Sequence, residues 1–316
     1  MSIIAIVGSG YMGGGIAQLF ARAGHEVRLA DVSHDIAASN LARIVQEARD
    51  FQAEGLFAPG SADAVAAHVT AAQSIEDAVA GADFIEEAVP EIIDVKHATL
   101  RRISAAAPTA TIGSNTSTIR IELLAGAVEN PGRFFGVHFS NPAPFIPGVE
   151  VIPHPGTDPD RIPPVEELLR GIGKTPARVT DATGFVLNRL QYALFHEATQ
   201  LVDEGVASTE DIDAIVRTTF GFRLPFFGPF AIADMAGLDV YAFCYSSLQT
   251  EFAERFATPP SLSALVEAGR LGTKTGGGFR DVAADRIPEL VAYRNRAYAK
   301  MQALVDELGP SPFDER

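Results

Sequence analysis

Short apolar runs alternate with longer amphipathic stretches through the first half of the chain. The run IIAIV at 3–7 is rich in β-branched residues, and it predicts a buried strand. Further strands are expected at 25–31, near 66–71, at 82–89 and at 110–117, and helices at 13–23, 35–55, 74–80 and 95–107. Because strands alternate with helices, the pattern predicts an α/β domain with a doubly wound, mostly parallel sheet.

This alternation ends near residue 180. Beyond it the pattern predicts helices at 184–205, 209–219, 229–255, 261–269 and 285–308. The segment DATG at 181–184 marks the change. We therefore expect an α/β domain over 1–182 and an all-α domain over 183–316, with the last three residues, DER, solvated.

Composition narrows the classes of partner. The chain has 316 residues, 25 Lys plus Arg, and 40 Asp plus Glu, a formal charge of −15. Such an acidic chain disfavours nucleic acid or an anionic membrane as the main partner. The lone Cys244 excludes an internal disulfide and fits the cytoplasm, and no apolar stretch reaches the ~18 residues of a membrane span. The seven histidines are scattered, so no metal site is expected.

The segment VGSGYMGGGIA has the spacing G-x-G-x-x-G between the first strand and the first helix. Such glycines permit a tight turn, close approach of a pyrophosphate, and packing of helix on strand. Asp31 ends the second strand, 21 residues after Gly10, where a carboxylate accepts ribose hydroxyls and repels a 2′-phosphate. The pattern predicts NAD rather than NADP, bound by Gly8, Gly10, Tyr11, Met12, Gly13 and Asp31.

A candidate acid–base pair lies in GVHFSNPAPFIPGVEVIP at 136–153. His138 ends an apolar run, and the prolines after it force a loop before the strand VEVI returns with Glu150. A carboxylate on one ring nitrogen leaves the other free to take a proton from an alcohol. From this stretch alone, a packed histidine and an unrelated carboxylate remain an alternative.

The sequence resembles the 3-hydroxyacyl-CoA dehydrogenase family over nearly its whole length. The matching segments are VGSGYMGGGIA, EEAVPE, SNTS, HFSNP with VEVI, GFVLNRL, GPFAIADMAGLD and GTKTGGGF, in the family's order. The resemblance implies an NAD-binding Rossmann domain and a helical domain that forms a homodimer. It also implies that His138 and Glu150 are the catalytic pair.

The resemblance assigns roles to five further residues. Ser117 would hydrogen-bond the reacting oxygen, and Asn188 would help to hold the forming carbonyl from the second domain. Asn141 would brace the loop after His138. Glu91 and Lys96 would lie near the cofactor and help to close the cleft.

Two departures bear on the substrate. The resemblance implies, for family members that use CoA, a lysine-rich helical hairpin after the second strand. The corresponding segment here, 40–63, contains no lysine. In addition, GFRLPFFGPF places Arg223 five residues before Gly228, and a guanidinium suits a carboxylate. This feature resembles the branch of lambda-crystallin, an L-gulonate 3-dehydrogenase, although a plain salt bridge is an equal interpretation.

We therefore expect an NAD-dependent dehydrogenase for a small-molecule secondary alcohol. The family default is a 3-hydroxyacyl-CoA such as 3-hydroxybutyryl-CoA, and the rival is a small free hydroxy acid such as L-gulonate or carnitine. A 6-phosphogluconate-like enzyme is disfavoured, because the helix beginning GFVLNRLQYALFHEA offers no lysine base. A non-catalytic, crystallin-like NAD-binding protein is the alternative from another class.

Overall fold

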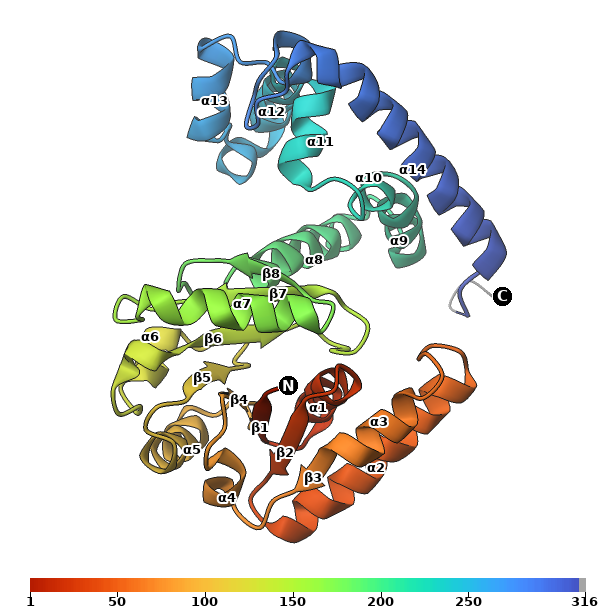
Figure 1. Cartoon of the computed structure of the whole chain (residues 1–316). Helices are drawn as coiled ribbons and strands as arrows, with labels where there is room; N and C mark the ends of the chain where they lie inside the picture. The colour runs from red at the N-terminus through yellow and green to blue at the C-terminus, as the bar shows by residue number, and fades with distance from the viewer. Residues whose placement is uncertain (313–316) are drawn as a thin grey trace. The chain divides into compact units, whose positions relative to one another are not determined.

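A computed structural model describes residues 1–312 and forms two compact units, Met1–Phe195 and His196–Arg316. The tail DER lies outside the described residues. The first unit is built on one sheet, and the second is helical (Figure 1). The expected class, an α/β unit followed by an all-α unit, is confirmed.

The sheet has eight strands in the order β3-β2-β1-β4-β5-β6-β7-β8. Every neighbouring pair is parallel except β6 and β7, which are antiparallel. The bounds are β1 Ile3–Val7, β2 Glu26–Ala30, β3 Val69–Ala71, β4 Phe84–Glu87, β5 Thr111–Ser114, β6 Phe134–Phe139, β7 Gly148–Ile152 and β8 Thr175–Arg178.

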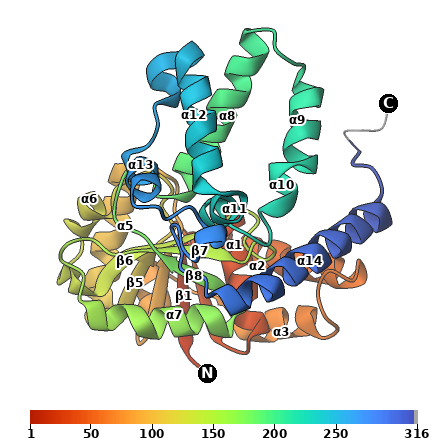
Figure 2. The ribbon, with the colours of Figure 1, turned by 90° about the horizontal axis from the view of Figure 1, so that it is seen from above.

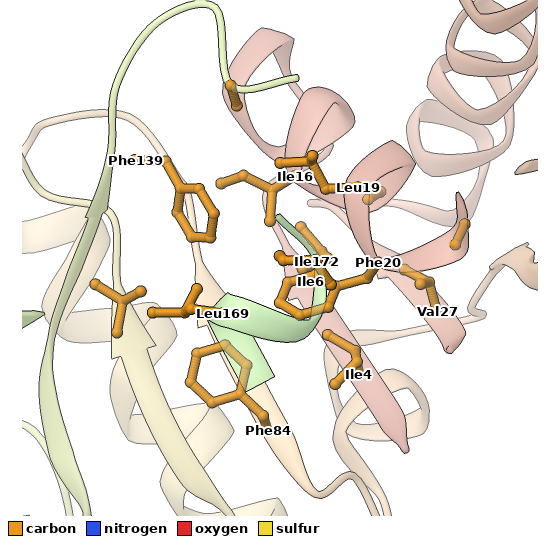
Figure 3. Packing of buried hydrophobic residues seen from close by; sticks show 14 of the residues in the cluster. Ile4, Ile6, Ile16, Leu19, Phe20, Val27, Phe84, Phe139, Leu169 and Ile172 are labelled. Carbon is orange, nitrogen blue, oxygen red and sulfur yellow. The ribbon is translucent and has the colours of Figure 1, made fainter. Parts of the chain in front are cut away.

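Helices cover both faces of this sheet, which explains why its strands are continuous apolar runs. In β1, Ile4 and Ile6 join one buried cluster, and Ala5 and Val7 join another, because successive side chains point to opposite faces. Figure 3 shows the first cluster, where Ile16 and Phe20 pack near Ile6. The helices of this unit are α1 Tyr11–Arg22, α2 His34–Ala53, α3 Ser61–His68, α4 Ile75–Val79, α5 Ile93–Ala106, α6 Ile121–Ala125 and α7 Ile162–Gly171.

The strand expected near 66–71 is partly wrong. Residues 66–68 end α3, and only Val69–Ala71 form β3. The sequence SADAVAAH is rich in alanine, the best helix former, and it follows Gly60 in a left-handed conformation (φ 84°). Helices α2 and α3 pack side by side as a hairpin (Figure 1). Edge strand β8 was not expected, because TPAR is mostly exposed and has no apolar run.

The second unit contains the helices that follow the sheet (Figure 2). The prediction of a single helix at 229–255 is wrong, because the helix is interrupted at Gly237. The φ of Gly237 is 105°, a backbone conformation that residues with a side chain rarely adopt. The bounds are α8 Leu187–Asp203, which begins in the first unit, α9 Thr209–Thr218, α10 Phe220–Arg223, α11 Pro229–Ala236, α12 Leu238–Phe252, α13 Pro260–Glu267 and α14 Ile287–Leu308.

Candidate active site

The glycine loop connects β1 to α1, and its three glycines have different surroundings. Gly8 has φ 104°, and a Cβ on it would lie 2.5 Å from the Ala88 carbonyl oxygen. A Cβ on Gly13 would overlap the Gly8 carbonyl, so this glycine lets the helix pack against the turn. A Cβ on Gly10 would meet nothing within 4 Å. The loop is therefore closely packed beneath and open at Gly10, where α1 presents its first N–H groups.

Asp31 lies directly after β2 and is held by the glycine loop. Its Oδ2 accepts hydrogen bonds from the Ser9 backbone N–H (2.7 Å) and the Ser9 hydroxyl (2.5 Å). The Asn40 side chain donates in turn to the Ser9 hydroxyl at 2.8 Å. Sequence reasoning missed Ser9 and Asn40, although the serine inside the glycine motif was a usable signal. Among residues 1–312, the second oxygen of Asp31 accepts a hydrogen bond only from the adjacent Val32 N–H, and Asp31 lines a cavity.

This first cavity has a volume of about 540 Å³. Arg102 on its wall is bound by two hydrogen bonds to Glu76 (2.8 and 2.9 Å), so the guanidinium is already neutralised. An open glycine, a helix N-terminus and an acceptor carboxylate are the groups that fit the pyrophosphate and ribose of NAD. The lining residues are Val7, Gly8, Gly10, Tyr11, Met12, Asp31, Val32, Ile75, Ala88, Val89, Pro90, Glu91, Val95, Thr99, Arg102, Asn115 and Ser117.

Glu91 lies on the wall of this cavity and organises the loop after β5. Its Oε1 accepts hydrogen bonds from the Thr116 hydroxyl (2.7 Å) and from the N–H groups of Ser117 and Thr118 (both 2.9 Å). Burial alone would raise its pKa, but these donors and Lys96 outweigh burial and lower the pKa of Glu91 to about 2. The carboxylate is therefore ionised and fixes the SNTS loop.

Lys96 does not line the cavity but lies beneath it. Its side chain is 1 % exposed, and Nζ contacts Glu87 Oε1 at 2.9 Å and Glu91 Oε2 at 3.4 Å. It also donates to the Val89 carbonyl at 3.2 Å. Lys96 thus supports the cavity wall from behind, through two carboxylates.

A second cavity of about 520 Å³ adjoins the first, since both are lined by Met12, Asn115 and Ser117. Asn115 is a residue that sequence reasoning missed, although it belongs to the quoted SNTS segment. Its Oδ1 accepts from the Phe139 N–H at 2.8 Å, which joins the end of β5 to the end of β6. The remaining lining residues are His138, Phe139, Ser140, Asn141, Ile146, Leu187, Asn188 and Gln191.

His138 and Glu150 meet across the one antiparallel strand pair of the described sheet. They are directly opposite in the register of β6 and β7, and His138 Nδ1 lies 2.8 Å from Glu150 Oε2. The other oxygen of Glu150 accepts from the N–H groups of Val186 and Leu187, both at 2.9 Å, where α8 begins. The prolines expected to return the chain precede β7, and strand pairing supplies the alignment. His138 is 5 % exposed and lines the second cavity.

The environment of Glu150 keeps it ionised. Burial by itself would raise its pKa, but the hydrogen bond with His138 and the two backbone N–H groups outweigh burial and lower the pKa below its ordinary value. An ionised carboxylate only accepts hydrogen bonds, so His138 Nδ1 carries the proton toward Glu150. The second ring nitrogen, Nε2, is then left as a proton acceptor.

Of the other predicted substrate-binding residues, Ser117, Asn188 and Asn141 line the second cavity, and Arg223 does not. Asn188 on α8 donates from Nδ2 to the Ser117 carbonyl at 2.8 Å, so both flank His138 in the second cavity. Asn141 is exposed and lines the same cavity. Arg223 lies in the second unit, where it lines a separate cavity of about 320 Å³ with Arg294 and Tyr298.

Features of two other functional classes are absent from residues 1–312. No group of three or more histidine, cysteine or acidic residues in this range is arranged to hold a metal ion. No helix in the same range is both long and apolar enough to cross a membrane.

Comparisons with known proteins identify the family and the fold. The family model for the 3-hydroxyacyl-CoA dehydrogenase NAD binding domain matches residues 3–182, and the model for the C-terminal domain matches 184–282. A crystal structure of a 3-hydroxyacyl-CoA dehydrogenase from Archaeoglobus fulgidus superposes with a TM-score of 0.81, at 28% identity, covering 97% of this chain and 99% of that one.

Two similar proteins differ in their substrates. A 5-formyl-3-hydroxy-2-methylpyridine 4-carboxylate 5-dehydrogenase of Mesorhizobium japonicum is 36% identical over 307 residues, covering 96% of this chain and 98% of that protein. A 3-hydroxybutyryl-CoA dehydrogenase of Clostridioides difficile is 33% identical over 280 residues, covering 88% and 98%. With both domain models matched, the chain belongs to the 3-hydroxyacyl-CoA dehydrogenase family, and it is an NAD-dependent oxidoreductase acting on a secondary alcohol.

Proposed function

We propose that this enzyme oxidises the 3-hydroxyl of a 3-hydroxyacyl-CoA, such as 3-hydroxybutyryl-CoA, to the 3-keto product. The observation that carries the proposal is the contact of His138 with Glu150 in a cavity that adjoins the NAD cavity. An alcohol bound there would lie between a proton acceptor and the cofactor. The names of the Clostridioides difficile relative and of other similar proteins support a thioester substrate.

His138 acts as the general base. Its Nε2 takes the hydroxyl proton, and ionised Glu150 stabilises the imidazolium that results. When bound, NAD supplies the hydride acceptor. Ser117 and Asn188, which line the same cavity, hold the substrate oxygen, and the Asn188–Ser117 hydrogen bond fixes their spacing. Glu91 keeps the backbone of Ser117 in place.

A small free hydroxy acid is the second candidate, favoured by the hairpin of α2 and α3. Phe145, in the loop after His138, packs against Phe51 and Phe57, with ring centroids 5.1 and 5.8 Å apart. These rings pack the loop against the hairpin, and 40–63 supplies no lysine for a CoA phosphate. Arg223 would then bind the substrate carboxylate, and the Mesorhizobium japonicum relative is named for a substrate with a carboxylate.

The helical unit favours a homodimer. Its buried apolar cluster is small, comprising Ala233, Leu238 and Leu262, and no residue of α9 is buried. Large apolar side chains remain exposed on this unit, and such surface is normally covered by a partner. They include Val206, Ile215, Phe230, Val240 and Phe243. We propose that 183–316 is the dimerisation domain, joined to a 1–182 NAD domain, and analytical ultracentrifugation tests the dimer.

The substrate experiment compares NAD reduction with 3-hydroxybutyryl-CoA, 3-hydroxybutyrate, L-gulonate and carnitine at equal concentration. Rapid turnover of the thioester alone supports the leading proposal and removes the carboxylate role of Arg223. Turnover of a free acid alone, reduced in Arg223→Met, selects the second candidate. If none is oxidised while NAD binds normally, both substrate proposals fail.

A further inference from the structure

A third cavity in the first unit carries two basic side chains and has no role in the proposed reaction. It has a volume of about 330 Å³ and is lined in part by Pro144, Phe145 and Pro147 of the loop after His138. Within residues 1–312, its wall contains no acidic side chain. The lining residues are Leu19, Arg22, Ala23, Pro144, Phe145, Pro147, Gly171, Ile172, Gly173 and Lys174.

Lys174 is the buried cation of this cavity, with 6 % of its surface exposed. Its Nζ donates to the carbonyl oxygens of Ala143 and Ile146, at 2.5 and 2.7 Å. An ammonium has three N–H donors, so one remains beyond these two. Burial, and then the charge of Arg22, lower the pKa of Lys174 to about 8, so the group is mostly charged at neutral pH.

Arg22 ends α1 and stacks on an aromatic ring instead of pairing with an acid. Its guanidinium carbon lies 3.7 Å from the centroid of the Phe57 ring. The buried Nε has no hydrogen-bond partner among the described residues, and no ion pair joins Arg22 to a carboxylate there. Burial lowers the pKa of Arg22, yet a guanidinium remains charged.

Neither Lys174 nor Arg22 has an acidic side chain on the wall of this cavity, and the charge of Arg22 disfavours the charged form of Lys174. A bound anion would offset this repulsion. The chain carries 40 acidic residues against 25 basic ones, so neutralising partners are abundant elsewhere. A guanidinium fork with an ammonium is the donor set that recognises phosphate oxygens. We propose that the cavity between Arg22 and Lys174 is a binding site for a phosphate group.

The site is connected to the reaction cavity through the loop. Lys174 holds the Ile146 carbonyl, and the Ile146 residue also lines the cavity of His138. A phosphate on Lys174 therefore steadies the wall against which the substrate packs. The phosphate comes either from solution or from the nucleotide end of a CoA substrate, and only this second source rests on the proposed function.

The first experiment measures binding without turnover. Enzyme saturated with NAD, so that the glycine loop is occupied, is titrated with inorganic phosphate against chloride at constant ionic strength and pH 7. We expect a saturable rise of about 2 °C or more in the unfolding midpoint. Arg22→Gln should abolish the rise, and Arg49→Gln, a matched change on exposed α2, should retain it. No rise in the wild type, or an equal rise in Arg22→Gln, overturns the proposal.

The second experiment identifies the source of the phosphate. Substrate KM is measured with 3-hydroxybutyryl-CoA and with 3-hydroxybutyryl-pantetheine, which lacks the nucleotide phosphates. If the substrate fills the site, Arg22→Gln raises KM about fivefold or more for the CoA thioester alone, and inorganic phosphate competes with it. If free phosphate fills the site, it changes both KM values equally in the wild type and neither in Arg22→Gln. Should neither thioester be oxidised, the substrate proposal fails, and the phosphate titration still decides the binding site.

Discussion

His138 and Glu150 face each other across the only antiparallel strand pair of the described sheet, with Nδ1 and Oε2 separated by 2.8 Å. Strand pairing fixes the two backbones, and the start of α8 fixes the far oxygen of Glu150 through two N–H groups. The base is therefore oriented by the sheet and by the first turn of the next helix together. This rigidity is what a proton acceptor needs before substrate binds.

His138→Gln should lower kcat by about 10²–10⁴-fold, because the variant loses the general base but keeps a similar volume. NAD affinity should stay unchanged, since His138 does not line the first cavity. Steady-state kinetics and NAD titration by fluorescence measure both quantities. His97→Gln is the control, because His97 lines neither cavity and its ring contacts the Leu123 carbonyl of α6. Wild-type turnover in His138→Gln would remove His138 from the mechanism.

Glu150→Gln should lower kcat by about 10²-fold, because a neutral amide stabilises the imidazolium less. The same change should also alter how the free energy of unfolding depends on pH. The pKa of Glu150 is lower in the folded state than its ordinary value, so ionisation stabilises the fold above about pH 4.5. This contribution is lost as pH falls through the folded pKa. Denaturant unfolding of both proteins should show a difference at pH 7 that shrinks toward pH 3, and a constant difference would mean that ionisation of Glu150 does not stabilise the fold.

Replacing Asp31 by serine and Val32 by arginine should shift the cofactor preference from NAD toward NADP. The carboxylate accepts from ribose hydroxyls, and a charge-assisted hydrogen bond contributes about 1.5–3 kcal/mol, which corresponds to roughly 10–100-fold in kcat/KM. Val32 is exposed on the cavity wall, so an arginine there can reach a 2′-phosphate. The ratio of kcat/KM for the two cofactors is the measurement. Ser9→Ala, which removes one donor to Asp31, should leave the preference for NAD intact.

The sequence was sufficient for the features that depend on local pattern. Gly8, Gly10 and Asp31 were predictable because strand, loop, helix and acid occur in a fixed order. The pairing of His138 with Glu150 needed the family resemblance, because a twelve-residue separation does not define a register.

What the sequence did not reveal depends on contacts between distant segments. Lys96 was expected near the cofactor, and this stays a prediction. Its buried pairing with Glu87, behind the wall of the first cavity, was not foreseen. Strand β8 carries no apolar run, because it is an exposed edge that pairs only through its backbone with β7. The cavity between Arg22 and Lys174 is lined by the end of α1 and by the turn between α7 and β8. These two residues are 152 positions apart (22 and 174), so no local sequence pattern indicates the cavity.

Glu86 supplies a final prediction, because it is an acid enclosed within the apolar sheet. It is fully buried on β4, and neither carboxyl oxygen has a hydrogen-bond partner among residues 1–312. Burial, with the charge of Glu87, raises the pKa of Glu86 well above its ordinary value, so the folded state keeps the proton. The unfolded state releases this proton above about pH 4.5, and stability is then lost as pH rises toward the folded pKa.

Glu86→Gln should therefore gain stability relative to the wild type as pH rises above about 4.5, whereas Glu54→Gln at the exposed end of α2 should not. Gly113 provides an independent check on the position of the Glu86 carboxyl, since a Cβ on Gly113 would overlap Glu86 Oε2. Gly113→Ala should destabilise the wild type by about 1–3 kcal/mol through overpacking. The loss should be smaller in a Glu86→Val background, where the close contacts with Phe84 and Val137 remain. Urea unfolding of the wild type, the two single variants and the double variant measures the coupling free energy between the two positions. Additive changes in the free energy of unfolding would show that the Glu86 carboxyl does not occupy the space beside Gly113.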